Sequence, residues 1–167
     1  MRELPRSDEA EKELLGQILS DPKCIEEVKD LIPSPEVFYS TAHQVLWKVI
    51  SDMHNRKEEI GYVTVIDNIP KEYKEMLSAY YITGLIEGVP TTLTAPIHAR
   101  KVYEKWLLRK TINDAETISN AGTLKDADAY ELVQRLHDST YKIINMRPTE
   151  KFDLDSLLDD TIDRIYD

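Results

Sequence analysis

Cysteine and glycine are scarce in this sequence of 167 residues: Cys24 is its single cysteine, and it has five glycines. One cysteine cannot close an intrachain disulfide or build a CxxC metal site, and its lone presence agrees with a reducing compartment. The glycines are too far apart to form a phosphate-binding loop, and no GxxxxGK(S/T) motif occurs. The sequence therefore predicts neither a disulfide-stapled domain nor an ATP-hydrolysing site.

Long apolar runs are missing as well. No stretch approaches the roughly 18 consecutive apolar residues that a membrane-spanning helix needs. The first residues include Arg2, Glu3, Arg6 and Asp8, which do not resemble the basic region and apolar core of a signal peptide. We therefore expect a soluble, cytoplasmic protein with no membrane partner.

Basic residues are in the minority: 21 Lys and Arg face 31 Asp and Glu, for a net charge of −10. Because proteins bind nucleic-acid backbones by neutralising phosphates with Lys and Arg, we expect this chain to contact DNA only indirectly. The four histidines never occur at HxxxH or HExxH spacing, so no metal site is predicted. Acidic clusters such as Glu9, Glu11 and Glu13 are interpreted as the solvated face of a helix. These observations argue against the alternative of a metal-dependent hydrolase built on a helical bundle.

Helical periodicity runs through most of the sequence and predicts an all-α fold. Ser7 and Ser40 stand where they can cap the helices that follow them. The run from Tyr62 to Ile66 has strand propensity, but no second run offers a pairing partner, so we predict a short helix there. A further helix is expected from about residue 71 to 87, with an interruption near Gly84.

The second half of the chain has the pattern of two long helices. The first runs from residue 96 to 120, capped near Thr94 and stopped by Gly122. A short turn and a capping Asp126 lead into the second helix, so the two are expected to form an antiparallel hairpin. We divide the chain into a globular helical head (1–93), a helical hairpin (94–146), a linker (147–152) and a docking helix (153–167).

The apolar stripes of the hairpin are narrow, which indicates that another copy or another protein completes their burial. The predicted hairpin interface consists of Leu108, Ile112, Ile118, Leu132, Leu136 and Ile143. The last segment has aliphatic residues on one face and aspartates on the other, and its roughly 14 residues are too few for a stable helix alone. The aliphatic residues of this docking helix are Leu154, Leu157, Leu158, Ile162 and Ile165. We expect this face to need a groove on another domain.

Several short motifs resemble, in the same order, those of the N-terminal region of DnaB-type replicative helicases. That region opens approximately as P-x-x-x-E-A-E-x-x-x-L-G-x-x-L-x-D-P, and this sequence has Pro5, Glu9-Ala10-Glu11, Leu15-Gly16, Leu19 and Asp21-Pro22. The later matches are Phe38-Tyr39 with Ala42-His43, Val63-Thr64-Val65, Val89-Pro90-Thr91, and Glu104-Lys105 with Leu107-Leu108-Arg109. Phe152 to Asp167 resembles the linker helix of the family. The resemblance thus covers essentially the whole chain.

The resemblance implies the collar of a hexameric helicase, a head and hairpin whose copies pair, from dimer to hexamer, into a trimer of dimers above the motor ring. In that family the collar recruits primase and influences the helicase loader, while the linker helix docks on the motor domain of the neighbouring subunit. Tyr81, Ile118 and Leu124 are implied as candidate primase contacts. ATP and Mg²⁺ are expected only in the motor domain, so this chain is expected to have no catalytic site and no cofactor.

Two interpretations of the chain stay open at this point. It is either a fragment of a full helicase or a stand-alone phage- or plasmid-type collar homologue that regulates a host replicative helicase. A RecA-like segment encoded directly after Asp167 would identify the first, and its absence would identify the second.

Overall fold

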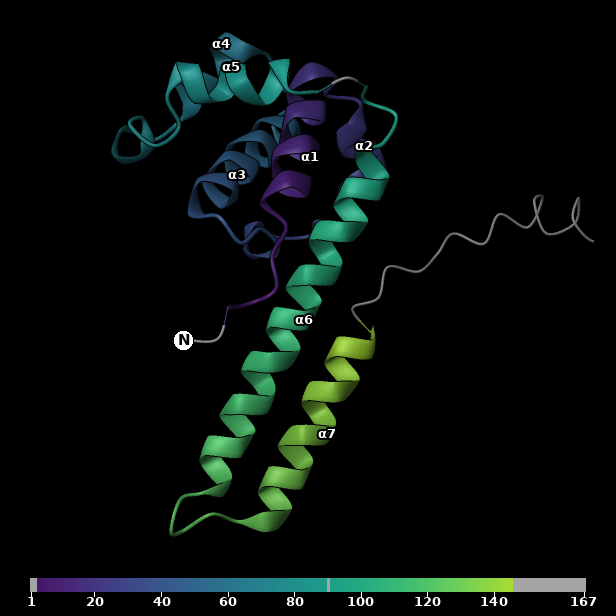
Figure 1. The fold of residues 1–167 in the computed structure, drawn as a ribbon, viewed down its shortest axis with the longest axis vertical. Helices are drawn as coiled ribbons and strands as arrows, with labels where there is room; N and C mark the ends of the chain where they lie inside the picture. The colour runs from purple at the N-terminus through teal and green to yellow at the C-terminus, as the bar shows by residue number, and fades with distance from the viewer. Residues whose placement is uncertain (1–2, 90, 146–167) are drawn as a thin grey trace, which may run out of the picture.

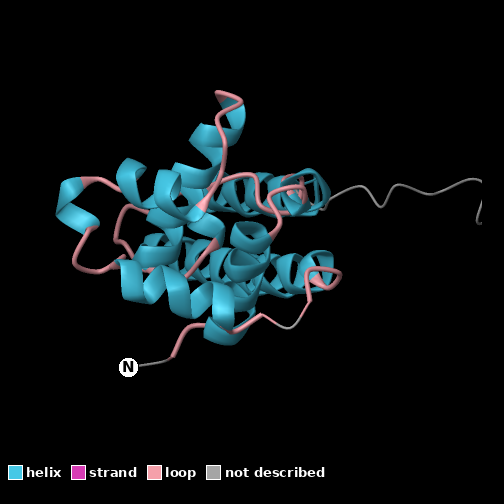
Figure 2. Ribbon diagram, turned by 90° about the horizontal axis from the view of Figure 1, so that it is seen from above, coloured by secondary structure: helices cyan, strands magenta, loops and turns pink. Residues whose placement is uncertain are grey.

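The computed structural model describes residues 3–89 and 91–145, and every regular element within these ranges is a helix. In chain order the elements are α1 (Asp8–Ser20), α2 (Cys24–Val28), the 3₁₀ turn η1 (Pro35–Val37), α3 (Thr41–Asn55), α4 (Tyr62–Asn68), the 3₁₀ turn η2 (Lys71–Tyr73), α5 (Ala79–Glu87), α6 (Ala95–Gly122) and α7 (Ala129–Asn145). The ribbon views show helices joined by loops and no strand in this part (Figures 1 and 2). The predicted all-α fold is therefore confirmed.

Two predicted segments, the linker (147–152) and the docking helix (153–167), lie outside the described residues. Among the helices that are described, none is both long and apolar enough to cross a membrane.

A head and a projecting pair of helices make up the described structure. Helices α1 and α2 pack against the first half of α6, α3 and α5 pack on α1, α4 lies against α3 and α5, and α7 returns antiparallel beside the second half of α6 (Figure 1). Ala95, Ala99 and Val102 of α6 are buried in the core of the head. The first turns of α6 therefore belong to the head's packing, and the predicted division of the chain at residue 93 stays a prediction.

α1 is the central helix of the head, since it packs against α2, α3, α5 and α6. Ala10, Leu14 and Ile18 recur every four residues and are buried, as are the adjacent Leu15 and Leu19. Full burial of an aliphatic side chain of the size of leucine contributes roughly 1.5–3 kcal/mol to stability. The apolar spacing of α1 thus accounts for much of the core of the head.

The contact between α1 and α5 depends on Gly16. A Cβ atom at this position would overlap the carbonyl oxygen of Leu85 and would lie 2.5 Å from Cγ2 of Val89. Glycine is needed here because the α5 backbone packs directly on the helix surface. Gly84, on α5 itself, is the opposite case, because a Cβ there would meet nothing within 4 Å.

The short helix predicted over the β-branched run is present as α4. The backbone N–H of Gly61 donates to Oγ1 of Thr64 at 2.9 Å, which satisfies one of the free donors that every helix start leaves. With no second strand within the described residues, helix formation is what satisfies the backbone of this run.

The prediction for residues 71–87 was wrong in detail. The interruption does not lie at Gly84, where α5 continues to Glu87, but before Ala79, between η2 and α5. Ser78 explains the start of α5, because its hydroxyl oxygen accepts a hydrogen bond from the backbone N–H of Tyr81 at 3.3 Å.

Two predicted caps also differ from the structure. Asp128, rather than Asp126, caps α7, since its Oδ1 accepts from the backbone N–H groups of Tyr130 and Glu131 at 2.8 and 3.1 Å. Thr94 stands at the start of α6, but its Oγ1 accepts from Nε2 of Gln17 at 2.6 Å and makes no capping bond. The tertiary contact to α1 has taken the place of the local one.

Gly16 and Gly84 give a matched stability test. We expect Gly16→Ala to lower the free energy of unfolding by about 1–3 kcal/mol, because the added methyl pushes α5 off α1. Gly84→Ala is expected to raise it by about 0.5–1 kcal/mol, because alanine favours the helix and meets open space. Urea unfolding followed by circular dichroism measures both, and equal effects of the two substitutions would contradict this account of Gly16.

Candidate partner-docking surface

A buried carboxylate joins α1 to the start of α3. Glu11 is 1% exposed. Its Oε1 accepts from the backbone N–H of Tyr39 at 2.6 Å, and its Oε2 accepts from that of Ser40 at 3.3 Å and lies 2.6 Å from Nδ1 of His43. The expectation that Glu11 belongs to a solvated face was therefore wrong. Ser40 makes no side-chain cap, and Glu11 satisfies the donors of the segment that leads into α3.

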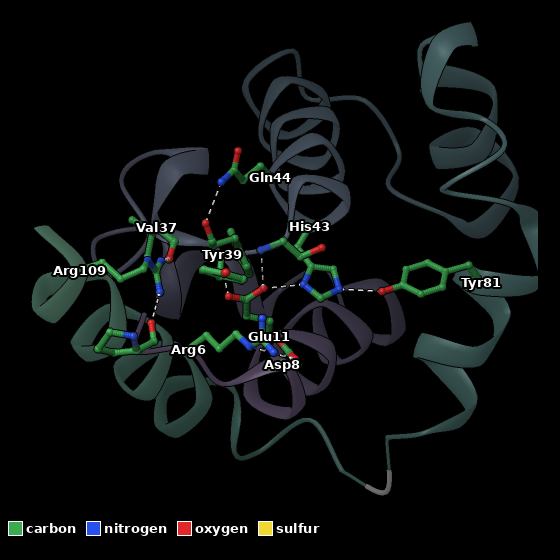
Figure 3. A network of polar contacts seen from close by, with 12 residues as sticks. Arg6, Asp8, Glu11, Val37, Tyr39, His43, Gln44, Tyr81 and Arg109 are labelled. Atoms are coloured by element: carbon green, nitrogen blue, oxygen red, sulfur yellow. Dashed lines mark hydrogen bonds and ion pairs between the residues drawn. The ribbon is translucent and has the colours of Figure 1, made fainter. Parts of the chain in front are cut away.

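His43 carries the contact on to α5. Its Nε2 lies 2.7 Å from the hydroxyl oxygen of Tyr81 (Figure 3). A neutral imidazole protonated on Nδ1 donates to Glu11 and accepts the O–H of Tyr81, so every polar atom in the chain of contacts is satisfied. Burial raises the pKa of the Tyr81 hydroxyl above its ordinary value, and the negative charge of Glu11 adds to the shift.

Arg109 connects α6 to the same region. Its side chain is largely buried and donates to the carbonyl oxygens of Pro5 at 2.9 Å and Val37 at 2.7 Å. The guanidinium carbon lies 5.4 Å from the ring centroid of Tyr39, within the range of a cation–π contact. Burial lowers the pKa of Arg109 from its ordinary value. The long helix is thereby attached to the chain before α1 and to η1.

Three of the motifs that carried the resemblance thus meet in one buried polar network. Glu11 comes from E-A-E, His43 from the element that begins with Phe38, and Arg109 from the start of the hairpin. The ring of His43 is 2% exposed, so no substrate reaches it from solvent. Among the described residues no group of three or more His, Cys, Asp or Glu could hold a metal ion. The network is interpreted as structural support.

Sequence reasoning missed Glu11 and Arg109 as members of a buried network, and it interpreted His43 as an ordinary structural or surface histidine. Charge patterning alone cannot reveal a buried carboxylate, since Glu9 and Glu11 look alike in the sequence. The one signal in the sequence that points to Glu11, His43 and Arg109 is that each stands among apolar residues within a motif of the resemblance.

The outward side of α7 is an apolar surface that no other described element of the chain covers. No residue of α7 is buried. Leu132, Ser139 and Ile143 share one side of the helix and are half-buried. The other large apolar and aromatic residues of α7 are exposed, and we name them the outer α7 face: Tyr130, Val133, Leu136, Tyr141 and Ile144. Packing on α6 therefore covers only one edge of the stripe.

The structure places all six residues of the predicted hairpin interface on α6 or α7. Leu108 and Leu136 are about half exposed, at 49% and 51%. Ile112, Ile118, Leu132 and Ile143 are half-buried. Whether they form an interface between copies stays a prediction.

The three candidate primase contacts do not come together in one chain. Tyr81 lies on α5 in the head, whereas Ile118 lies near the end of α6 and Leu124 lies in the turn at the far end of the hairpin (Figure 1). Tyr81 and Ile118 are half-buried, and Leu124 is 67% exposed.

The fold and its network define an all-helical head with a projecting antiparallel hairpin. The family model described as DnaB-like helicase N terminal domain matches residues 3–104, and the chain belongs to that family. The predicted resemblance is thereby confirmed.

Individual relatives agree with this assignment. Replicative DNA helicase DnaB of Geobacillus stearothermophilus is 31% identical over 153 residues, which cover 84% of this chain and 34% of the relative. Replicative DNA helicase DnaC of Bacillus subtilis is 26% identical over 164 residues, which cover 96% of this chain and 36% of the relative. The chain thus spans about a third of the length of these proteins.

Two solved structures share the fold. The crystal structure of the N-terminal domain of DnaB helicase from Mycobacterium tuberculosis aligns with a TM-score of 0.76 at 29% identity, covering 84% of this chain and 99% of that one. The structure of a DnaB-like replicative helicase, described with its interactions with primase, aligns with a TM-score of 0.68 over 93% of this chain and 34% of the other. At 20% identity the second match shows the fold alone.

Removing the buried carboxylate tests the network. Glu11→Ala leaves two backbone donors and His43 without an acceptor, so we expect the free energy of unfolding to fall by about 2–5 kcal/mol. Glu9→Ala, on the exposed side of α1, is expected to change it by less than about 0.5 kcal/mol. Chemical denaturation of both variants measures this, and similar losses in the two would show that Glu11 is not a support of the head.

Tyr81 gives a test by pH. The pKa of the Tyr81 hydroxyl is higher in the folded protein than in the unfolded chain. Its contribution to the free energy of unfolding is therefore fully present below the unfolded pKa of about 10 and is lost as pH rises through the folded pKa. The stability difference between the wild type and Tyr81→Phe should therefore narrow as pH rises above about 10. Denaturation at a series of alkaline pH values measures this difference. A stability difference that does not change with pH would show that the ionisation of Tyr81 is not coupled to folding.

Proposed function

We propose that this chain is the N-terminal oligomerisation and partner-docking domain of a hexameric replicative DNA helicase, and that it forms the collar that recruits primase. The outer α7 face is the observation that carries the proposal. Five large apolar or aromatic side chains lie exposed along one side of a helix in which no residue is buried. An exposed apolar patch of this kind marks an interaction site in most proteins that have one.

A second copy of the hairpin is the occupant that the geometry favours. Two antiparallel hairpins related by a two-fold axis bring the same face of each chain together, so one apolar stripe serves both sides of the contact. Glu131 and Arg135 lie on the other side of α7 and pair with each other at 2.6 Å, whereas His137 stacks on Tyr141 within the face. Pairing of this kind would cover the stripe without burying those charges.

Primase docking depends on assembly in this proposal. Tyr81 belongs to α5 in the head and Leu124 to the turn between α6 and α7 at the far end of the hairpin (Figure 1), and in this proposal a neighbouring copy supplies the second half of the surface. The DnaB-like replicative helicase whose structure includes its interactions with primase has the same fold, which supports a docking role for this architecture. A helicase loader is a further candidate partner.

The remaining expectations concern residues that the structure does not describe and regions beyond this chain. The docking helix (153–167) is proposed to bind the motor domain of a neighbouring subunit through its aliphatic face. ATP and Mg²⁺ are proposed to bind in a motor domain, since the chain spans about a third of its relatives. DNA contact is proposed to be indirect, given the net charge of −10.

A single substitution on the outer α7 face tests the assembly. Leu136→Asp is expected to weaken self-association at least about tenfold, because burying an unpaired carboxylate in the contact costs more than about 1.4 kcal/mol. The half-exposed position should leave the helical circular-dichroism spectrum unchanged. Sedimentation velocity over a range of protein concentrations measures the association.

The matched control is Lys142→Gln, which makes the same one-unit change in net charge at an exposed position on the opposite side of α7 and should leave self-association unchanged. A wild-type chain that stays monomeric at high concentration would argue against the proposed function. So would equal association of Leu136→Asp and the wild type.

A further inference from the structure

A groove lies between α1 and α5, on the side of the head that faces away from the buried core. Its volume is about 620 Å³, which is in the range of sites that bind several side chains of a ligand. It is lined by Glu9, Lys12, Glu13, Tyr80, Tyr81, Thr83, Gly84, Leu85, Glu87, Gly88 and Val89. Of the residues in the buried polar network, Tyr81 also lines this groove, whereas Glu11 and His43 do not.

The walls of the groove are aromatic and its floor is apolar. Tyr80 is 89% exposed, while the neighbouring Tyr81 is held at its hydroxyl by His43. Leu85 is buried beneath them. Gly84 leaves one turn of the wall without a side chain, because a Cβ there would meet nothing within 4 Å. An extended segment could therefore lie against the backbone of α5 at this point.

The rim of the groove is acidic. Three of its residues are glutamates, at positions 9, 13 and 87, against the single base Lys12. In the described part of the chain, none of these three glutamates is recorded in an ion pair or side-chain hydrogen bond, unlike Glu11 in the same helix. Their charges are therefore available to a ligand.

We infer that this groove binds a segment of a partner protein that carries arginine or lysine beside an aliphatic side chain. A guanidinium or ammonium group would lie between the tyrosine rings and the carboxylates, where cation–π attraction and charge-assisted hydrogen bonds both favour it. The aliphatic neighbour would pack against Tyr80, which is exposed, and Val89, which is half-buried. An acidic segment or a nucleic-acid strand would meet repulsion from the same rim.

The groove is preorganised because the side chain of Tyr81 is held in place by the buried network. Its ring is fixed through His43 to Glu11, so the partner does not have to order this side chain on binding. The inference rests on the proposed function in treating Tyr81 as part of a partner-docking surface, and it adds the chemistry of the segment that docks there.

Peptide binding to the full chain tests the inference. The probe is a fluorescein-labelled peptide of alternating leucine and arginine, compared with peptides that have glutamine or glutamate in place of arginine. Fluorescence anisotropy at an ionic strength of about 0.15 M limits long-range attraction to the acidic chain. We expect the arginine peptide to bind at least about tenfold more tightly than the glutamine peptide, and the glutamate peptide not to bind.

Variants separate the groove from general charge attraction. Gly84→Leu fills the open turn without a clash at Cβ and should weaken binding of the arginine peptide about tenfold, whereas the smaller side chain of Gly84→Ala should weaken it less. Glu87→Gln should also weaken binding. Glu116→Gln removes the same charge from the exposed surface of α6 and should have no effect.

Equal losses in Glu87→Gln and Glu116→Gln, or full binding by Gly84→Leu, would overturn the inference. The same variants are run in sedimentation velocity, where all should self-associate as the wild type does. Loss of peptide selectivity with normal self-association would reject the groove alone. Normal peptide selectivity in a chain that stays monomeric would instead reject the proposed assembly.

Discussion

The carboxylate of Glu11 is the contact on which the arrangement of the head depends. A buried carboxylate is costly unless several donors surround it, and here two backbone N–H groups and the imidazole of His43 do so. Those donors come from the segment that enters α3 and from α3 itself, so satisfying the charge also fixes the position of α3 on α1. Tyr81 extends the same constraint to α5. Apolar packing makes this head stable, and the polar chain selects one arrangement of its helices.

Arg109 transfers that constraint to the hairpin. It lies midway along α6, and its two hydrogen bonds to carbonyl oxygens hold the helix at the point where it leaves the head. Beyond Arg109 the described part of α6 has no buried residue, and α7 has none at all. The direction in which the hairpin projects is therefore set within the head, while its own apolar residues remain for contacts between molecules.

The sequence allowed most helices to be predicted because their signals are local. Apolar residues at helical spacing predicted α1, α3, α6 and α7, and the lack of a pairing strand correctly favoured a helix for the run that begins at Tyr62. The errors fall where a distant residue decides the outcome. Thr94 looked like a cap and is bonded instead to Gln17, and Glu11 looked solvated and is buried by α3. The hairpin stripe was visible in the sequence, but the side of it that α6 covers was not.

The two unpartnered surfaces lie far apart on one chain and are joined by the polar network. The groove shares Tyr81 with that network, and α6 is attached to it by Arg109. Glu11, His43 and Tyr81 link α1, α3 and α5, and Arg109 adds α6 through the neighbouring backbone of η1. A ligand that shifts Tyr81 therefore acts on the contacts that position the hairpin, whereas one on the outer α7 face acts first on an exposed helix. Partner docking could be coupled to assembly through this network. Its fully buried groups cannot move one at a time, because each such movement would leave a hydrogen-bond donor or a charge unsatisfied.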